Sequence, residues 1–136
     1  ANKVLDLKSG EDCNGAVLRP STRNGANAQR WVAIDPGNGY WRFVSKASAS
    51  NRCIDLASNS NALGTAIRLW QNYSNDAQAW KVTAVANGYY KIVSKVDATR
   101  GWDIPNCTMD GNSNLQLRDY YGTSCQLFKF KFIAMN

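Results

Sequence analysis

Histidine is missing from this chain of 136 residues, and glutamate occurs once, at Glu11. Without an imidazole, a nucleophile activated by histidine and a metal site ligated by histidine are both excluded. The sequence has ten acidic residues, so a pair of catalytic carboxylates would have to be built from aspartate. The titratable side chains therefore exclude several common kinds of enzyme chemistry.

Long apolar runs are missing as well. No stretch of about 18 apolar residues occurs, so no segment is predicted to span a bilayer. The opening residues Ala-Asn-Lys-Val lack the basic and then apolar build of a signal peptide, which indicates a mature or excised module. Charged residues are 19% and hydrophobic residues 44% of the chain, which excludes a disordered tail, a coiled coil and a collagen-like fibre. We expect one globular domain over residues 1–136, whose net charge of +6 favours polyanions without identifying one.

An internal repeat organises the chain. Shifted by 49 positions, Val4–Leu7 falls on Cys53–Leu56, and Gly39–Lys46 falls on Gly88–Lys95, without a gap. A shift of 48 from the second copy finds a third copy that starts around Gly101–Ile104. The predicted copies span roughly residues 1–38, 39–87 and 88–136.

Each copy reads as short strands separated by turns. Runs with period-two alternation, such as Tyr40–Val44 and Trp80–Val82, lie between clusters of Asn, Ser, Gly and Asp, and no helical period is sustained. A unit this short cannot bury its own apolar face, so the copies should close on a shared core. Three four-stranded units would not close a β-propeller ring. The predicted fold is an all-β trefoil, a short closed barrel capped by three hairpins.

One strand is predicted to be missing at the N-terminus. Three units of 49 would need 147 residues, 11 more than the chain has, and the Gly-Tyr-aromatic strand occurs only twice. The barrel could have eleven strands, the alternating tail Phe128–Met135 could help to cover the gap, or neighbouring sequence could have been trimmed. We expect partial cover by the tail.

The repeated motifs carry a family resemblance. Gln-x-Trp occurs at Gln29–Trp31 and Gln78–Trp80, a Gln-x-Phe variant occurs at Gln126–Phe128, and Cys-Ile-Asp-Leu occupies Cys53–Leu56. This pattern resembles the ricin-type β-trefoil superfamily, which includes R-type lectins and the carbohydrate-binding modules of family thirteen. The resemblance covers nearly the whole chain, and its triple recurrence makes it specific.

The resemblance implies one shallow sugar site in each copy. Such a site takes the Asp of the Cys-x-Asp strand, an aromatic residue after a Leu, a polar residue three positions later and the Gln of Gln-x-Trp. The second copy matches best, with Asp55, Trp70, Tyr73 and Gln78. An Asn is usual where Ala77 stands, so Asn75 or Asp76 is expected to substitute for it. These are the residues of the predicted second site.

The other two copies match the family less well. The third keeps Asp103 and Gln126 but has Arg118 at the aromatic position, which leaves Tyr120 or Tyr121 as the platform. The first copy has a serine in place of the ring, and its candidate residues are Asp6, Asn24 and Gln29. We rank the sites second, third, first.

Structural roles compete with these binding roles. Trp31, Trp80 and Phe128 recur once per copy and are predicted to lie in the core. Trp70 could instead pack against a hairpin at the end of its strand. The aspartates that recur in the three copies could share a structural task. Tyr73, Tyr120 and Tyr121 lie among polar turn residues, so we expect them to be exposed.

Four cysteines allow three disulfide pairings, and the sequence cannot choose among them. The resemblance implies a bond from the Cys of Cys-x-Asp to the residue two past the aromatic, but that place is Asn72, so Cys53 lacks its usual partner. Cys107 and Cys125 bracket the third site and are expected to pair, which leaves the pairing of Cys13 and Cys53 undecided.

Neither His nor a CxxC motif occurs, so we expect no metal or other cofactor. The Asn-, Ser- and Thr-rich composition fits an extracellular, secreted protein.

The leading hypothesis is a non-catalytic, monomeric module that holds a secreted polysaccharide-degrading enzyme on glycans of the galactose, xylose or arabinose type. Its expected partners are a polysaccharide or oligosaccharide and a linked catalytic domain, without nucleic acid or membrane insertion. The alternative is a basic trefoil interaction domain for sulfated glycan, protein or nucleic acid, although its Lys and Arg residues form no dense stripe. A third hypothesis, a small glycoside hydrolase, needs two carboxylates about 5–10 Å apart.

Overall fold

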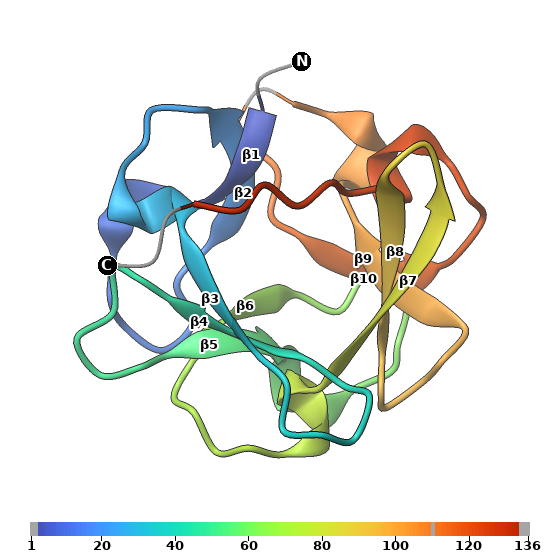
Figure 1. Cartoon of the computed structure of the whole chain (residues 1–136), viewed down its shortest axis with the longest axis horizontal. Coiled ribbons are helices and arrows are strands. Elements are labelled where there is room, and N and C mark those ends of the chain that lie inside the picture. The colour runs from blue at the N-terminus through green and yellow to red at the C-terminus, as the bar shows by residue number, and fades with distance from the viewer. Residues whose placement is uncertain (1–2, 110, 134–136) are drawn as a thin grey trace.

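The computed structural model describes residues 3–109 and 111–133, and this part of the chain forms ten β-strands. The strands are β1 (Lys3–Leu7), β2 (Leu18–Thr22), β3 (Trp31–Ile34), β4 (Arg42–Ser45), β5 (Cys53–Leu56), β6 (Ile67–Trp70), β7 (Trp80–Ala86), β8 (Tyr89–Ser94), β9 (Arg100–Asp103) and β10 (Gln116–Asp119) (Figure 1). No helix in the described ranges combines the length and hydropathy needed to cross a bilayer.

Three antiparallel hairpins repeat along the chain: β1–β2, β5–β6 and β9–β10. A single 3₁₀ turn follows each of their six strands. These turns are η1 (Lys8–Gly10), η2 (Asn27–Gln29), η3 (Ala57–Asn59), η4 (Asp76–Gln78), η5 (Pro105–Cys107) and η6 (Ser124–Gln126). Two of the hairpins are extended by further strands, in the orders β3-β4-β5-β6 and β7-β8-β9-β10, whereas β1 and β2 form a two-stranded sheet.

The three hairpins close on one another through backbone hydrogen bonds. Such bonds join every pair: Leu69 N–H donates to Ala16 C=O (3.1 Å), Leu117 N–H to Thr65 C=O (2.9 Å) and Leu115 N–H to Leu18 C=O (2.8 Å). The first copy is thus bonded to the second, the second to the third, and the third back to the first. This cyclic arrangement confirms the predicted trefoil.

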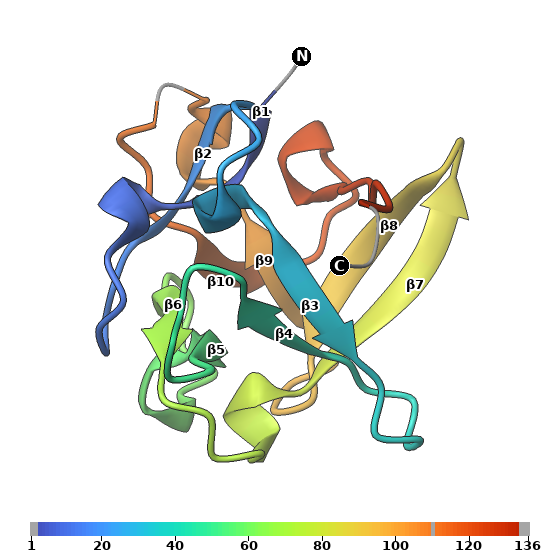
Figure 2. The same ribbon diagram turned by 60° about the vertical axis from the view of Figure 1, so that its left-hand side comes forward.

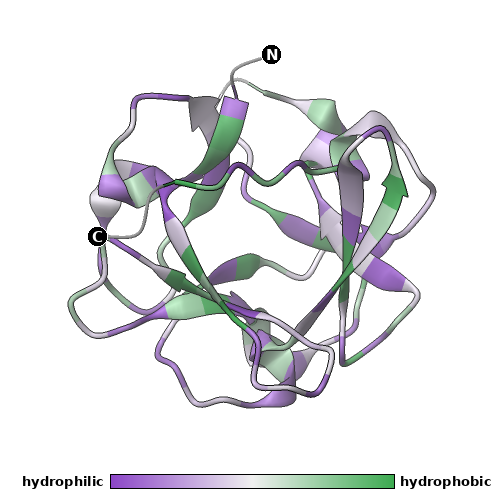
Figure 3. Cartoon of the chain, in the orientation of Figure 1, coloured by the Kyte–Doolittle hydropathy of each residue, from purple (hydrophilic) through white to green (hydrophobic). Residues whose placement is uncertain are grey.

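The core is built from equivalent residues of the three copies. Leu7, Leu56 and Ile104 form one such set, and Leu18, Ile67 and Leu115 form another, all of them buried. Along β2 and β6, buried and partly exposed residues alternate, and Figure 3 shows apolar and polar stretches following one another along the strands. This is the pattern expected of strands that place one face on a core.

The aromatic rings of the Gln-x-aromatic motifs point inward, as predicted. Trp80 is fully buried, and its indole N–H donates to Ile54 C=O at 3.1 Å. Trp31 and Phe128 are partly buried and pack against the core. Trp102 is 5% exposed and meets Trp80 edge to face, with the ring centroids 5.6 Å apart.

The tail after the third motif packs against β8 and β4. Phe128 exchanges two backbone hydrogen bonds with Tyr90, of 2.7 and 2.9 Å, just as Trp80 does with Trp41 one copy earlier. Phe130 stacks on Phe43 at 6.0 Å and meets Tyr90 edge to face at 5.5 Å. The tail, in dark red, lies next to β8 in Figures 1 and 2, and in Figure 1 it runs from there across the molecule.

Phe128 and Phe130 of the tail therefore pack against the barrel. Phe130 is still 50% exposed and Phe132 is 80% exposed, so the cover is partial. Ala134 and Met135, which we included in the alternating tail, lie outside the described residues.

Candidate functional site

The β5–β6 hairpin positions the predicted second site. In its antiparallel register, Asp55 lies opposite Arg68. Ile67 and Leu69 are fully buried, and successive side chains of a strand point to opposite faces. Arg68 and Trp70 therefore lie together on the face that points away from the core, beside Asp55.

A cavity of about 460 Å³ opens at this face. It is lined by Asp55, Leu56, Ser58, Asn59, Arg68, Trp70, Tyr73, Asn75 and Ala77. Four of the predicted site residues are thus brought together: Asp55, Trp70, Tyr73 and Asn75. Tyr73 is 59% exposed, Trp70 is partly exposed, and Asp55 is buried.

Arg68 is a component of the site that the motif comparison missed. Its guanidinium carbon lies 3.8 Å from the centroid of the Trp70 ring, and its Nε donates to Asp55 Oδ2 at 3.5 Å. The guanidinium therefore covers one face of the indole and partly neutralises the carboxylate. Strand alternation could have revealed this residue, because Arg68 stands two positions before Trp70. Tyr73 is consequently the more accessible ring of the cavity.

Gln78 supports the site from behind. It is 1% exposed and does not line the cavity. Its Nε2 donates to Gln71 C=O (2.6 Å) and to Asp55 Oδ1 (3.2 Å), while its Oε1 accepts from the N–H groups of Tyr73 (2.9 Å) and Ser74 (3.1 Å). All hydrogen-bonding groups of the amide are engaged, so Gln78 fixes both the loop and the carboxylate.

Burial sets the electrostatics of Asp55. Desolvation raises the pKa of Asp55 above its usual range, and the hydrogen bond from Gln78 and the charge of Arg68 oppose that rise. Gln78 bonds to one oxygen of the carboxylate and Arg68 to the other, and the outer edge of the carboxylate faces the cavity.

The equivalent aspartates have equivalent partners. Asp6 accepts from Arg19 Nε at 3.0 Å, and Asp103 accepts from Gln116 Nε2 at 2.8 Å. Both aspartates are buried. In every copy, then, the repeated Asp joins the two strands of its hairpin, which is the shared structural task left open by the sequence.

In the predicted third and first sites, the repeated glutamine also forms hydrogen bonds with the loop that follows its hairpin. Gln126 Nε2 donates to Asp119 C=O (2.8 Å), and its Oε1 accepts from Tyr121 N–H (2.7 Å). Gln29 Oε1 accepts from Asn24 N–H at 2.8 Å. Tyr121 is 72% exposed, as expected, while Tyr120 is half-buried.

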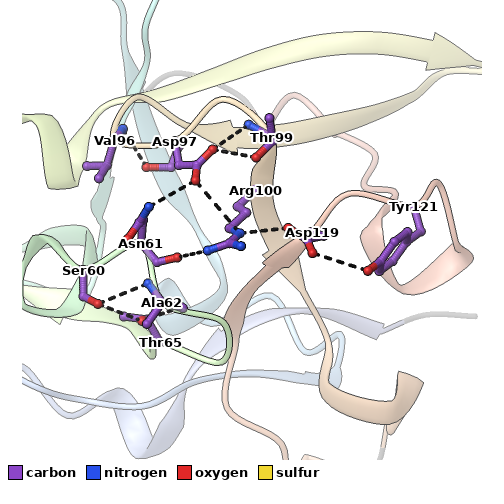
Figure 4. A network of polar contacts seen from close by, with 11 residues as sticks. Ser60, Asn61, Ala62, Thr65, Val96, Asp97, Thr99, Arg100, Asp119 and Tyr121 are labelled. Atoms are coloured by element: carbon purple, nitrogen blue, oxygen red, sulfur yellow. Dashed lines mark hydrogen bonds and ion pairs between the residues drawn. The ribbon is translucent and has the colours of Figure 1, made fainter.

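A polar network holds Tyr121 and joins the second copy to the third (Figure 4). The Tyr121 hydroxyl donates to Asp119 Oδ2 at 3.4 Å, and Arg100 Nε donates to Asp119 Oδ1 at 2.8 Å. Arg100 also donates to the backbone carbonyl of Asn61 in the second copy. The hydrogen bond to Asp119 raises the pKa of Arg100, while hydrogen bonds from Thr99 hold the pKa of Asp97 below its usual value.

The cysteine prediction is confirmed. Cys107 and Cys125 form a disulfide, and Cys13 and Cys53 are free thiols. Burial raises the pKa of the Cys53 thiol to about 12.

Three hairpins closed cyclically around one core define a β-trefoil. The family model of ricin-type β-trefoil lectin domain-like proteins matches residues 1–70 and again residues 49–118. The chain belongs to this family. The two overlapping matches are displaced by one copy, as expected of an internal repeat.

Solved structures share this fold. The designed threefold-symmetric protein ThreeFoil has a TM-score of 0.88 at 24% identity, over 93% of this chain and 89% of that one. An exo-β-1,3-galactanase from Clostridium thermocellum has a TM-score of 0.87 at 29% identity, and the match covers 93% of this chain but only 27% of the galactanase. The C-half of an earthworm R-type lectin, solved with GalNAc, has a TM-score of 0.67 at 18% identity, with 93% and 88% covered. No curated protein sequence matches the chain.

Proposed function

We propose that this chain binds carbohydrate without transforming it, through the cavity of the second copy. The observation that carries the proposal is the convergence of Asp55, Trp70, Tyr73 and Asn75 on one open cavity of about 460 Å³. A cavity of this size accommodates a sugar residue with its substituents. The chain belongs to a lectin-like family, which supports a role in carbohydrate binding.

The chemistry of the lining suits a pyranose. The sugar's C–H face stacks on the exposed ring of Tyr73, and its hydroxyls bond to Asp55 and Asn75. Because the Arg68 guanidinium already lies on the Trp70 indole, Trp70 contacts the sugar through the open edge of its ring and also holds the guanidinium in place. One stacked ring and two polar contacts correspond to binding near the millimolar range, roughly −4 kcal/mol.

Further sites would raise the apparent affinity for a polymer. The third-copy candidates are Asp103, Tyr121 and Gln126, and the first-copy candidates are Asp6, Asn24 and Gln29. Two weak sites on one polymer bind about 10²-fold more tightly than one where the geometry allows both to be filled.

We further propose that the module anchors a secreted polysaccharide-degrading enzyme to glycans of the galactose, xylose or arabinose type. The support is the galactanase, in which a region similar to this chain makes up 27% of a larger enzyme. The Cys107–Cys125 disulfide fits an oxidising, extracellular setting.

Affinity electrophoresis in gels that contain galactan, agarose, xylan or alginate tests the binding. We expect retardation in at least one gel, and Tyr73→Ala should weaken it about fivefold, which is the loss of roughly 1 kcal/mol of ring contact. Tyr89→Ala is the matched control, since Tyr89 is 38% exposed and lies outside the cavity. Unretarded migration in every gel would refute the proposal.

Two further measurements separate the rival functions. A glycoside hydrolase would release new reducing ends from the polymer, and the purified chain should release none. A purely electrostatic binder would weaken steeply as salt rises, whereas ring stacking should persist.

A further inference from the structure

A second cavity is lined in part by Ser74, Asn75 and Asp76, which follow Tyr73 in the chain. Its volume is about 60 Å³, and the polar residues around it include Asn38, Arg42, Ser74, Asn75, Asp76 and Lys95. Asn75 lines this cavity and the larger one as well. Asn75 therefore stands between the two cavities.

Among the described residues, Arg42 has no carboxylate within ion-pair distance. It is half-buried at the start of β4, and its Nη1 donates to Ser74 Oγ at 3.1 Å. Its Nε is shielded from solvent and has no hydrogen-bond partner in the part of the chain that the structure describes. By contrast, Arg19, Arg52, Arg68 and Arg100 each pair with an aspartate. A half-buried guanidinium with one neutral acceptor is undersatisfied, which favours a bound anion.

Lys95 supplies a second positive charge beside the same cavity. Its Nζ lies 5.2 Å above the centroid of the Tyr40 ring and 3.3 Å from Asp76 Oδ1. The Asp76 side chain is 61% exposed, so this ion pair is open to solvent and weak. An incoming anion can displace Asp76 at little cost.

We propose that the smaller cavity is a subsite for the carboxylate of an acidic sugar, next to the sugar bound at Asp55. This inference rests on the proposed function and narrows its ligand to polysaccharides that carry uronic acid residues. The volume of about 60 Å³ admits a carboxylate but no sugar ring. A planar carboxylate also matches the flat, forked donors of a guanidinium.

The test compares a glucuronoxylan with the same polymer after its carboxyl groups have been reduced to alcohols. We expect the native polymer to bind about tenfold more tightly, the effect of one charge-assisted contact. Arg42→Gln and Lys95→Gln should each remove most of this difference and leave binding of the reduced polymer unchanged. Thermal unfolding checks that both variants are folded.

Lys46→Gln is the matched control. Lys46 is the residue that corresponds to Lys95 one copy earlier, is exposed, and lines neither cavity. It removes the same charge from the surface, so a change of more than twofold in this variant would show that general electrostatics, not a subsite, sets the preference.

The remaining outcomes separate the two proposals. Equal binding of both polymers, still weakened by Tyr73→Ala, overturns the subsite and leaves the carbohydrate site standing. A preference for a sulfated galactan over its desulfated form, lost in Arg42→Gln, without any preference for the uronic acid polymer would overturn the carboxylate assignment. Binding to no polymer at all overturns the proposed function, and the subsite with it.

Discussion

Replacing Gln78 by alanine tests the claim that the repeated glutamine is a structural frame. The substitution removes four hydrogen bonds from a side chain that is 1% exposed. It leaves the N–H groups of Tyr73 and Ser74, one carbonyl and the buried Asp55 carboxylate without that partner. A buried group that loses its partner costs about 1–3 kcal/mol, and water entering the exposed loop recovers part of this cost. We expect a loss of about 3 kcal/mol in the free energy of unfolding.

Thermal and urea unfolding measure this loss. At about 2.1 cal/mol/K of unfolding entropy per residue, 136 residues correspond to roughly 290 cal/mol/K, so a loss of about 3 kcal/mol lowers Tm by about 10 °C. The melting curve is read by circular dichroism or fluorescence, and the urea midpoint gives an independent value of the same free energy.

The other copies provide graded controls. Gln126 is 3% exposed and makes three hydrogen bonds, so Gln126→Ala should cost about 2 kcal/mol. Gln29 is partly exposed and makes two, so Gln29→Ala should cost about 1 kcal/mol or less. Equal losses in all three variants, or a loss below about 0.5 kcal/mol for Gln78→Ala, would contradict the assignment of Gln78 as a frame residue.

Two other regions give independent predictions. Gly101 occupies the position of Cys53 in the third copy, and a Cβ there would lie 2.2 Å from the Ile92 carbonyl oxygen. Gly101→Ala should therefore lower the free energy of unfolding by about 3 kcal/mol, as measured by urea unfolding. A neutral result would mean that β8 and β9 separate easily. Cys53 is fully buried, and its pKa is raised to about 12. Iodoacetamide should therefore label Cys13 in the native protein and Cys53 only after unfolding, as measured by intact mass. Fast labelling of Cys53 in the native protein would show that β5 opens.

The fold was predictable because three copies impose the same apolar pattern on one core. The burial of Trp80 and the partial burial of Trp31 and Phe128 follow from their recurrence, since one ring per copy must meet the others inside a closed barrel. The tail was harder to assign. Phe130 packs on Phe43 and Tyr90, whereas Phe132 is 80% exposed, and the alternation of the tail is the same at both.

The candidate site was predictable only in part. Asp55, Trp70, Tyr73 and Asn75 do meet at one cavity. The motif could not show that the Arg68 guanidinium lies on the Trp70 ring, because that contact depends on the rotamer of a long, flexible side chain. Spacing likewise could not tell whether the amide of a glutamine points to a ligand or back to its own loop.

The differences among the copies indicate where specificity resides. The frame is the same in each: a buried Asp bonded across its hairpin and a Gln bonded to the loop that follows. The residue near the end of the second strand of each hairpin differs, with Ser21, Trp70 and Arg118 in the three copies. A residue that the fold needs must recur wherever the fold recurs, whereas a residue that reads a ligand is free to vary from copy to copy. Substitutions in the frame should therefore change stability first, and substitutions at the variable ring and loop positions should change which glycan is bound.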